Sequence, residues 1–170
     1  KRIDGVEVSS LIGGNPAGTE AIANKYGIKH WGHDLAEGIE RADAVILATP
    51  TQMHREQGEQ VMRAGKPVLI EIPISDKVQD SEELVAISKE TGMIAMAGHV
   101  RRFNPSHQWI KQRLVKGELA IQQMDVQTYF FRRSNINAAG KPRSWTDHLL
   151  WHHACHTVDL FHYQTGETSS

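Results

Sequence analysis

The stretch Ala44-Val45-Ile46-Leu47-Ala48-Thr49-Pro50-Thr51 is an unbroken apolar run that ends in a polar turn. Strands of a parallel sheet have this pattern when helices cover both of their faces. A second apolar run, Val68-Leu69-Ile70, ends in Glu71-Ile72-Pro73, and helix-like segments lie before and between the two runs. Because strands and helices alternate in this way, the sequence predicts parallel β-α-β units and an α/β fold.

The same alternation continues outward on both sides of these runs. Pro16 suits the first position of a helix, Asp34 suits a helix N-cap, and Gly27 and Gly92 suit helix ends. We predict further helices after Asp34 and around Leu84. The remaining predicted elements are strands over residues 6–12, 28–31, 44–48, 68–70 and 93–97, and helices over residues 16–26, 52–64 and 104–117.

The pattern changes beyond residue 100, where we place a domain boundary. Residues 121–131 alternate between apolar and polar side chains, which predicts a longer strand with one solvated face. Asp147 can cap a final helix that runs to about Tyr163. We therefore expect an α/β domain over residues 1–100 and the start of an α+β unit over residues 101–170.

Composition excludes several classes of protein. The 170 residues carry a net charge of -1, whereas nucleic-acid-binding proteins usually have a basic excess. The single cysteine, Cys155, cannot form an intrachain disulfide, which fits a reducing cytoplasm. Because no run of about 18 apolar residues is present, we expect no membrane span. We expect a cytoplasmic protein that acts on a small molecule, without nucleic acid or membrane as a partner.

Polar turns follow the predicted strands, at the sheet edge where open parallel sheets bind their ligands. In order and spacing, these turns resemble those of the Gfo/Idh/MocA oxidoreductases, whose pattern is T-P-x-x-x-H, then E-K-P, then R-F-N-P, and later a helix with D-x-x-x-H-x-x-D. The turns are Gly13-Gly14-Asn15, Thr49-Pro50-Thr51-Gln52-Met53-His54, Glu71-Ile72-Pro73 and His99-Val100-Arg101-Arg102-Phe103-Asn104-Pro105.

The resemblance implies a Rossmann-like parallel sheet followed by a substrate domain, in a dehydrogenase that acts on a CH-OH group with NAD or NADP. The sequence departs from the family pattern, because the first strand and its G-x-G-x-x-G turn are missing. Ile72 stands at the lysine position, and His152 stands at the first acid position. We therefore expect the chain to be a fragment of a longer protein, which is a homo-oligomer when full length.

Residues 98–107, 122–133 and 144–153 are similar in particular to one branch of the family. That branch serves aromatic catabolism, in the protocatechuate 4,5-cleavage route. It oxidises the hemiacetal of a dicarboxylic semialdehyde to 2-pyrone-4,6-dicarboxylate and reduces NADP. Two alternatives stay open: a sugar or polyol dehydrogenase of the same family, and a non-catalytic binding protein that keeps the fold.

The predicted final helix carries a row of histidines. His148, His152 and His156 are spaced i, i+4 and i+8, so they share one helix face. Oxidation of a hemiacetal needs a base for the hydroxyl proton, and histidine suits this role near neutral pH. By resemblance His156 takes the family's histidine position, so we expect His156 or His152 as the base and Asp159 to orient it or relay its proton. Alternatively, these histidines only form hydrogen bonds in a core or lie on a solvated face.

The histidine row also has a spacing that permits a metal site, with Cys155 beside it. However, Cys155 points about 100° away from His156 on a helix. No Cys-x-x-Cys or His-Glu-x-x-His pair is present, so we predict no metal site.

The cofactor and substrate residues are expected at the strand ends and in the later loops. The first predicted strand is followed by no acid before Glu20, which favours NADP, with NAD also possible. A dicarboxylate substrate needs guanidinium partners, although paired arginines are often only surface charge. We expect cofactor contacts from Gly13, Asn15, Thr49, Pro50, Thr51, His54, Glu71, Pro73 and His99, and substrate contacts from Arg101, Arg102, Arg143, Trp145 and His148.

Overall fold

The computed structural model describes residues 3–129, 131, 134, 136, 142 and 149–167. The chain divides into two compact units, Lys1–Met96 and Ala97–Ser170. The assignment of residues 1–100 to a cofactor domain and of residues 101–170 to a substrate domain stays a prediction.

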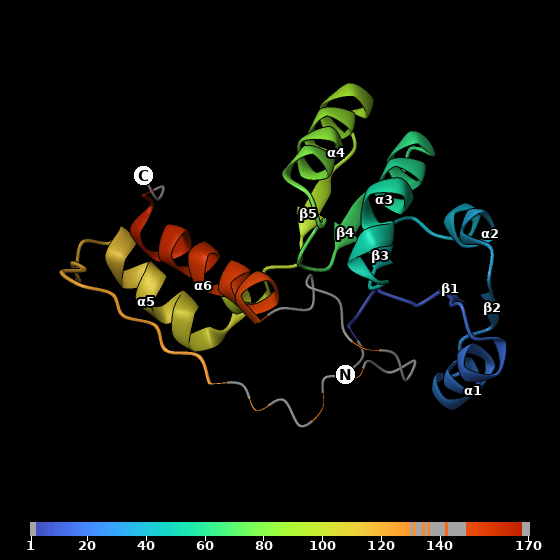
Figure 1. Cartoon of the computed structure of the whole chain (residues 1–170), viewed down its shortest axis with the longest axis horizontal. Coiled ribbons are helices and arrows are strands. Elements are labelled where there is room, and N and C mark those ends of the chain that lie inside the picture. The colour runs from blue at the N-terminus through green and yellow to red at the C-terminus, as the bar shows by residue number, and fades with distance from the viewer. Residues whose placement is uncertain are drawn as a thin grey trace. The chain divides into compact units, whose positions relative to one another are not determined.

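The first unit alternates strands and helices as the sequence predicts (Figure 1). The strands are shorter than predicted, and the helix predicted over 52–64 is divided between the 3-10 turn η1 and α3. The elements are β1 (Ser10–Ile12), α1 (Pro16–Tyr26), β2 (His30–Gly32), α2 (Leu35–Glu40), β3 (Val45–Leu47), η1 (Thr51–Met53), α3 (His54–Arg63), β4 (Val68–Ile70), α4 (Val78–Thr91) and β5 (Ala95–Ala97).

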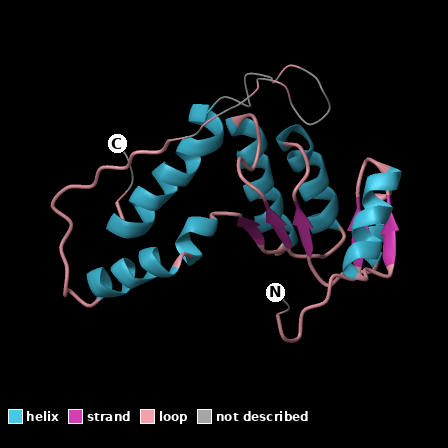
Figure 2. Cartoon of the chain, turned by 90° about the horizontal axis from the view of Figure 1, so that it is seen from below, coloured by secondary structure: helices cyan, strands magenta, loops and turns pink. Residues whose placement is uncertain are grey.

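The strands form two separate sheets, visible as two groups of arrows in Figure 2. In one, β1 and β2 run parallel with Ser10 opposite His30; in the other, the order is β3-β4-β5, and Val45 lies opposite Val68 in the parallel pair β3-β4. The doubly wound order 3-2-1-4-5-6 has a central first strand. The two sheets of this chain correspond to the strands on either side of that central strand. In the described part of the chain, no strand lies between β1 and β3 to join the sheets. This agrees with the predicted sheet that lacks its first strand.

The predicted helix boundaries have the expected local chemistry. Asn15 caps α1, with Pro16 in the first turn, and the Asp34 carboxylate accepts from Ala36 N at 2.8 Å to cap α2. Gly27 ends α1 with φ of 70°, a left-handed conformation that glycine adopts without a steric penalty. Met53 occupies the N-cap position of α3, and Thr51 begins η1.

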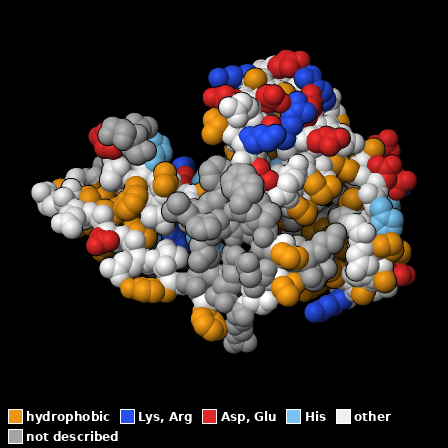
Figure 3. Space-filling view, in the orientation of Figure 1, with side chains coloured by type: hydrophobic (Ala, Val, Ile, Leu, Met, Phe, Trp, Pro, Cys, Tyr) orange, Lys and Arg blue, Asp and Glu red, His pale blue; other side chains and the backbone are white. Residues whose placement is uncertain are grey.

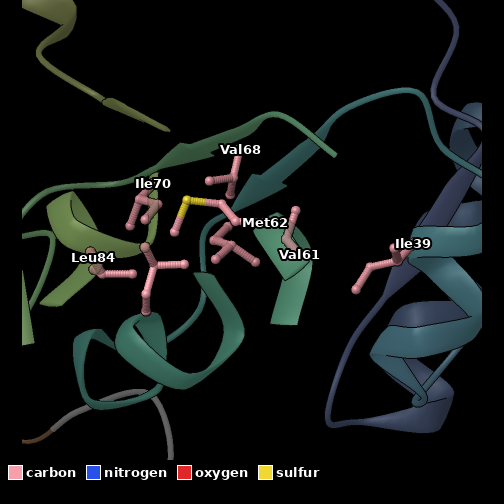
Figure 4. Close-up of a cluster of buried hydrophobic side chains, with 8 residues drawn as sticks. Ile39, Val61, Met62, Val68, Ile70 and Leu84 are labelled. Carbon is pink, nitrogen blue, oxygen red and sulfur yellow. The ribbon is translucent and has the colours of Figure 1, made fainter. Parts of the chain in front are cut away.

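The main core lies where α3 and α4 pack against β3 and β4 (Figure 4). Val61 and Met62 of α3 are completely buried, and full burial of such side chains contributes about 1.5–3 kcal/mol each. Ile39 reaches the same cluster from α2. The buried members are Ile39, Leu47, Val61, Met62, Val68, Ile70, Leu84 and Ile87.

The opposite face of the β3-β4-β5 sheet is not covered by the described residues. Ile46, at the centre of β3, is 71% exposed, while its neighbour Leu47 is 3% exposed. The expectation that helices cover both faces of this strand is therefore met on one side. An apolar side chain remains exposed there because the described helices next to β3 and β4 pack on the Leu47 side.

The outer surface of α3 and α4 carries charges of both signs, which Figure 3 shows gathered over these helices. Arg63 bridges Glu59 and Glu90 at 2.8 and 3.0 Å, and Arg55 contacts Glu83 at 2.7 Å. These pairs are solvent-exposed, so each contributes little to stability. The apolar core beneath α3 and α4 therefore stabilises their packing more than these ion pairs do.

The second unit consists of η2 (Val100–Phe103), α5 (Pro105–Val115) and α6 (Leu149–Thr165), and α5 packs against α6. The strand predicted over 121–131 was wrong for the described residues, because 121–129 form no strand. A strand needs a neighbour for its backbone N–H and C=O groups, and the described residues supply none there. Asp147, the predicted cap of the final helix, lies outside the described residues.

Among the described helices, none combines the length and the apolar character that crossing a membrane requires.

Replacing Met62 by alanine tests the core. We expect Met62→Ala to lower the free energy of unfolding by about 2–5 kcal/mol, because it leaves a cavity between α3 and the sheet. Urea denaturation measures this change. Val85→Ala, on the exposed side of α4 at 50% exposure, is the control and should change the free energy by less than about 1 kcal/mol. Equal losses for both variants would contradict the assignment of the core.

Candidate functional site

The turn after β3 is held in place by a buried histidine. His54 is 1% exposed, and its Nε2 lies 2.8 Å from the Thr49 carbonyl oxygen while its Nδ1 lies 3.0 Å from that of Pro73. Both ring nitrogens face carbonyl oxygens, and the tautomer decides which oxygen accepts the N–H. His54 thus ties the end of β3 to the loop that follows β4. Its predicted contact with the cofactor stays a proposal.

The predicted cofactor residues after β3 and β4 are brought together at one edge of this sheet. Glu71 continues the ladder, because its N–H donates to the Leu47 carbonyl at 2.9 Å. Thr49 Oγ1 donates to Gln57 Oε1 at 2.6 Å, and Thr51 is buried beneath the turn. Pro50 is exposed in the same turn. Sequence reasoning missed Gln57, because nothing in its local pattern shows that it orients Thr49.

The turn after β1 forms a second group of predicted cofactor residues. Gly13 donates to the Gly32 carbonyl at 3.0 Å, and its own carbonyl oxygen lies 2.7 Å from His33 Nδ1. A Cβ at position 13 would lie too close to the Thr19 hydroxyl, so another residue there would force the Thr19 side chain to shift. Asn15 accepts from Gly18 N at 3.3 Å. His33 was also missed from the sequence, because it lies 20 residues from the turn that it contacts.

Three residues that we predicted for different roles meet in the second unit. The Arg102 guanidinium donates to both carboxylate oxygens of Asp159, with Nε at 2.9 Å from Oδ2 and 3.1 Å from Oδ1. His99 Nδ1 lies 3.6 Å from Asp159 Oδ2. The Asp159 side chain is only 8% exposed, so its charge is stabilised mainly by Arg102. The cluster joins η2, at the end of β5, to α6.

The electrostatics of this cluster follow from burial and charge. The hydrogen bond with Asp159 raises the pKa of Arg102, which remains a cation. Burial lowers the pKa of His99 below its ordinary value; the Asp159 carboxylate opposes this effect and the Arg102 guanidinium adds to it. His99 is therefore a neutral imidazole at neutral pH.

The neighbouring arginine is in a different environment. Within the described part of the chain, no hydrogen bond or ion pair is found for the Arg101 side chain, whereas the Arg102 side chain is bound to Asp159 and lies 5.4 Å from the Tyr163 ring. Arg101 lines a hollow between α5, α6 and residues 121–127. Two adjacent arginines thus have different partners, although the sequence gives them the same predicted role.

The predicted residues of α6 are only partly described. His156 is partly buried one turn before Asp159. Burial raises the pKa of the Cys155 thiol, so it is protonated at neutral pH and is a poor metal ligand. The described residues contain no group of three His, Cys, Asp or Glu side chains arranged to hold a metal. The side chain of His152, and all of Arg143, Trp145 and His148, lie outside the described residues.

Replacing His54 by leucine tests the link between the two strand ends. We expect His54→Leu to lower the free energy of unfolding by roughly 2 kcal/mol or more, because one carbonyl oxygen loses its donor in a buried site. The matched control is His33→Leu, whose carbonyl partner is open to water, with an expected loss under about 1 kcal/mol. Denaturant titration of both variants checks this, and a larger loss for His33→Leu would be inconsistent with the structure.

The adjacent arginines allow a second paired test. Arg102→Ala leaves the Asp159 carboxylate without its cation in a nearly buried position, and we expect it to destabilise the protein by about 3 kcal/mol. Arg101→Ala should cost less than about 1 kcal/mol, because no described partner is lost. Thermal melts of the two variants at one pH measure the difference. Similar melting temperatures would argue against the ion pair.

Comparison with known proteins places both parts of the chain. Residues 1–99 match the model of the oxidoreductase family with an NAD-binding Rossmann fold, and residues 105–170 match bacterial oxidoreductases, C-terminal. The chain is 61% identical over 169 residues to 4-carboxy-2-hydroxymuconate-6-semialdehyde dehydrogenase of Sphingobium sp., which covers 98% of the chain and 54% of that protein. It is 34% identical over 102 residues to scyllo-inositol 2-dehydrogenase (NAD(+)) of Bacillus subtilis, covering 59% of the chain and 30% of that protein.

The fold is shared with solved structures. Scyllo-inositol dehydrogenase from Lactobacillus casei, with bound NAD(H) and scyllo-inositol, superposes with a TM-score of 0.78 at 22% identity, over 97% of this chain and 50% of that one. An oxidoreductase domain protein from Kribbella flavida has the same TM-score and identity, over 95% and 46%. The chain thus spans about half the length, or less, of the relatives that it matches. With its Rossmann-like strand order, its strand-end turns and these matches, the chain belongs to the Gfo/Idh/MocA oxidoreductase family.

Proposed function

We propose that this chain is part of an NADP-dependent dehydrogenase that oxidises 4-carboxy-2-hydroxymuconate-6-semialdehyde, in its hemiacetal form, to 2-pyrone-4,6-dicarboxylate. The reaction belongs to protocatechuate 4,5-cleavage catabolism in the cytoplasm. The observation that carries the proposal is the 61% identity to the Sphingobium dehydrogenase over 98% of the chain. We propose that the whole protein acts as a homo-oligomer.

The strand-end residues fit part of a nicotinamide dinucleotide. The turn after β3 consists of Thr49, Pro50 and Thr51, of which Thr51 is buried. His54 contacts the carbonyl oxygen of Thr49, and Glu71 follows β4. This edge suits the nicotinamide half, together with Pro73 and His99. A Gly-rich turn that would supply backbone amides to the pyrophosphate is not present in the sequence. When bound, the cofactor supplies the acceptor for a hydride.

The turn after β1 supports NADP over NAD. Gly13 and Asn15 lie in the turn where NAD-dependent enzymes carry an acidic residue. That acid binds the two ribose hydroxyls of NAD and repels the 2′-phosphate of NADP. The described residues of this turn carry no carboxylate. His33 Nδ1 lies 2.7 Å from the Gly13 carbonyl oxygen beside this turn.

The second unit carries the residues for the substrate and its proton. Arg101 supports a carboxylate-bearing substrate, because it is a guanidinium with no partner among the described residues. Arg143, Trp145 and His148 complete the proposed substrate set. The base for the hydroxyl proton is a histidine of this unit, and the family motif proposes His156 or His152 of α6.

A polyol dehydrogenase is the second candidate. The 34% identity to scyllo-inositol 2-dehydrogenase favours it. Ile72 argues against it, because the family pattern has lysine at this position in the sugar-oxidising relatives.

An assay of the intact protein that carries this chain tests the proposal. We expect NADPH formation with the semialdehyde hemiacetal and none with myo-inositol or glucose. We also expect kcat/KM to be at least about tenfold higher with NADP than with NAD, which corresponds to about 1.4 kcal/mol. Absorbance of the reduced cofactor measures both. Oxidation of the polyols would favour the second candidate, and a preference for NAD would refute the assignment of the turn after β1.

A further inference from the structure

His99 lies in the arrangement that a general base requires. Its Nδ1 is buried and faces the Asp159 carboxylate at 3.6 Å, while the side chain as a whole is 24% exposed. Nδ1 is therefore not part of the exposed surface of the ring. The exposed surface lies on the side of the ring that carries Nε2. Nδ1 makes no hydrogen bond to the described residues, and the carboxylate faces it from just beyond hydrogen-bond distance; with Nε2 left for the substrate, this approaches the geometry by which an aspartate orients a catalytic histidine.

We propose that His99 accepts the hydroxyl proton of the substrate through Nε2, and that Asp159 is the positioning residue that orients it. This inference rests on the proposed dehydrogenase function. It moves the base from the α6 histidines to the segment that follows β5. It also gives Asp159 a partner at the residue before η2 rather than on its own helix.

Asp159 is suited to positioning because it is itself held in place. Arg102 donates to both of its oxygens, and Tyr163 lies beneath the guanidinium at 5.4 Å from the ring centre. With both oxygens accepting from Arg102, the carboxylate cannot rotate away from His99.

The charges around His99 leave it able to accept a proton. The groups that face it are Asp159 from α6 and Arg102 from η2. Burial lowers the pKa of His99, so the ring is neutral and can act as a base near neutral pH. After it takes a proton, the nearby carboxylate stabilises the imidazolium, and Arg102 partly offsets this.

The position of His99 in the fold agrees with this role. It lies two residues beyond Ala97, the last residue of β5, at the carboxyl end of a strand in an open α/β sheet. Ligands of such sheets bind at this edge.

The step balances with the oxidised nicotinamide as the only other reactant. The C–H bond of the hemiacetal carbon breaks, and its hydrogen leaves with the electron pair as hydride to the nicotinamide ring. The O–H bond breaks, and its proton goes to His99 Nε2. The electron pair of the O–H bond forms the new C=O bond of the lactone.

The test uses the intact protein and the pH dependence of kcat/KM with the hemiacetal. For a base, kcat/KM rises with pH through the pKa of the free residue, so the wild-type acid limb should lie below the ordinary histidine range. We expect His99→Gln to lower kcat/KM about 100-fold, to change KM little and to abolish this limb. His162→Gln, an exposed histidine of α6, is the control and should keep the wild-type profile.

Asp159→Asn provides a variant that keeps the shape of the side chain. Because Asp159 raises the pKa of His99, its loss should shift the acid limb to lower pH and reduce kcat by about tenfold. An NMR titration of the His99 ring nitrogens in both proteins checks the same shift without substrate. A His99 pKa that does not fall in Asp159→Asn overturns the positioning role.

The variants separate this inference from the proposed function. A wild-type protein that oxidises neither the hemiacetal nor the polyols refutes the proposed function, and the base role falls with it. Suppose that the wild type is active. If kcat/KM of His99→Gln is then within about threefold of the wild-type value and the acid limb is unchanged, the inference is overturned and the proposed function is not. Loss of the limb only in His156→Gln would return the base to α6.

Discussion

The packing of α3 and α4 on one face of β3 and β4 determines where these strands end, and the candidate cofactor residues follow those ends. Val61 and Met62 are completely buried in this contact, and Leu84 and Ile87 of α4 complete it. Because the core sets the position of α3, it also sets the position of His54, the first residue of that helix. His54 then links the turn after β3 to the loop after β4, so the geometry of the turn depends on the apolar contact below it.

In the second unit the corresponding constraint is electrostatic. A carboxylate that is 8% exposed must have a cation nearby, because an unpaired buried charge is strongly unfavourable. Arg102 satisfies Asp159, and this requirement separates it from Arg101. The same pair keeps η2 next to α6, so a residue from the end of β5 and residues of the histidine-bearing helix belong to one cluster. The ion pair therefore organises the chemistry of this unit as well as its packing.

The two sheets show what a parallel fold requires of its strands. β1 and β2 form one pair and β3, β4 and β5 form another sheet, which are the two flanks of a doubly wound order around a central strand. The exposed face at Ile46 and the absence of a strand at residues 121–129 have a similar cause. A strand is stable only where neighbours satisfy its backbone and cover its faces, and the described residues do not provide these neighbours at either place.

The sequence by itself determined the alternation of strands and helices, the helix start at Pro16, the cap at Asp34, the stop at Gly27 and the identity of the strand-end turns. These features depend on residues within a few positions of one another, through backbone preference, capping and the period of apolar side chains. Only the tertiary structure decided that His33 contacts Gly13, that His54 is buried between two carbonyls and that Arg102, rather than Arg101, binds Asp159 57 residues later. The partner of a buried polar group depends on which elements pack together, and local sequence carries no information on that choice.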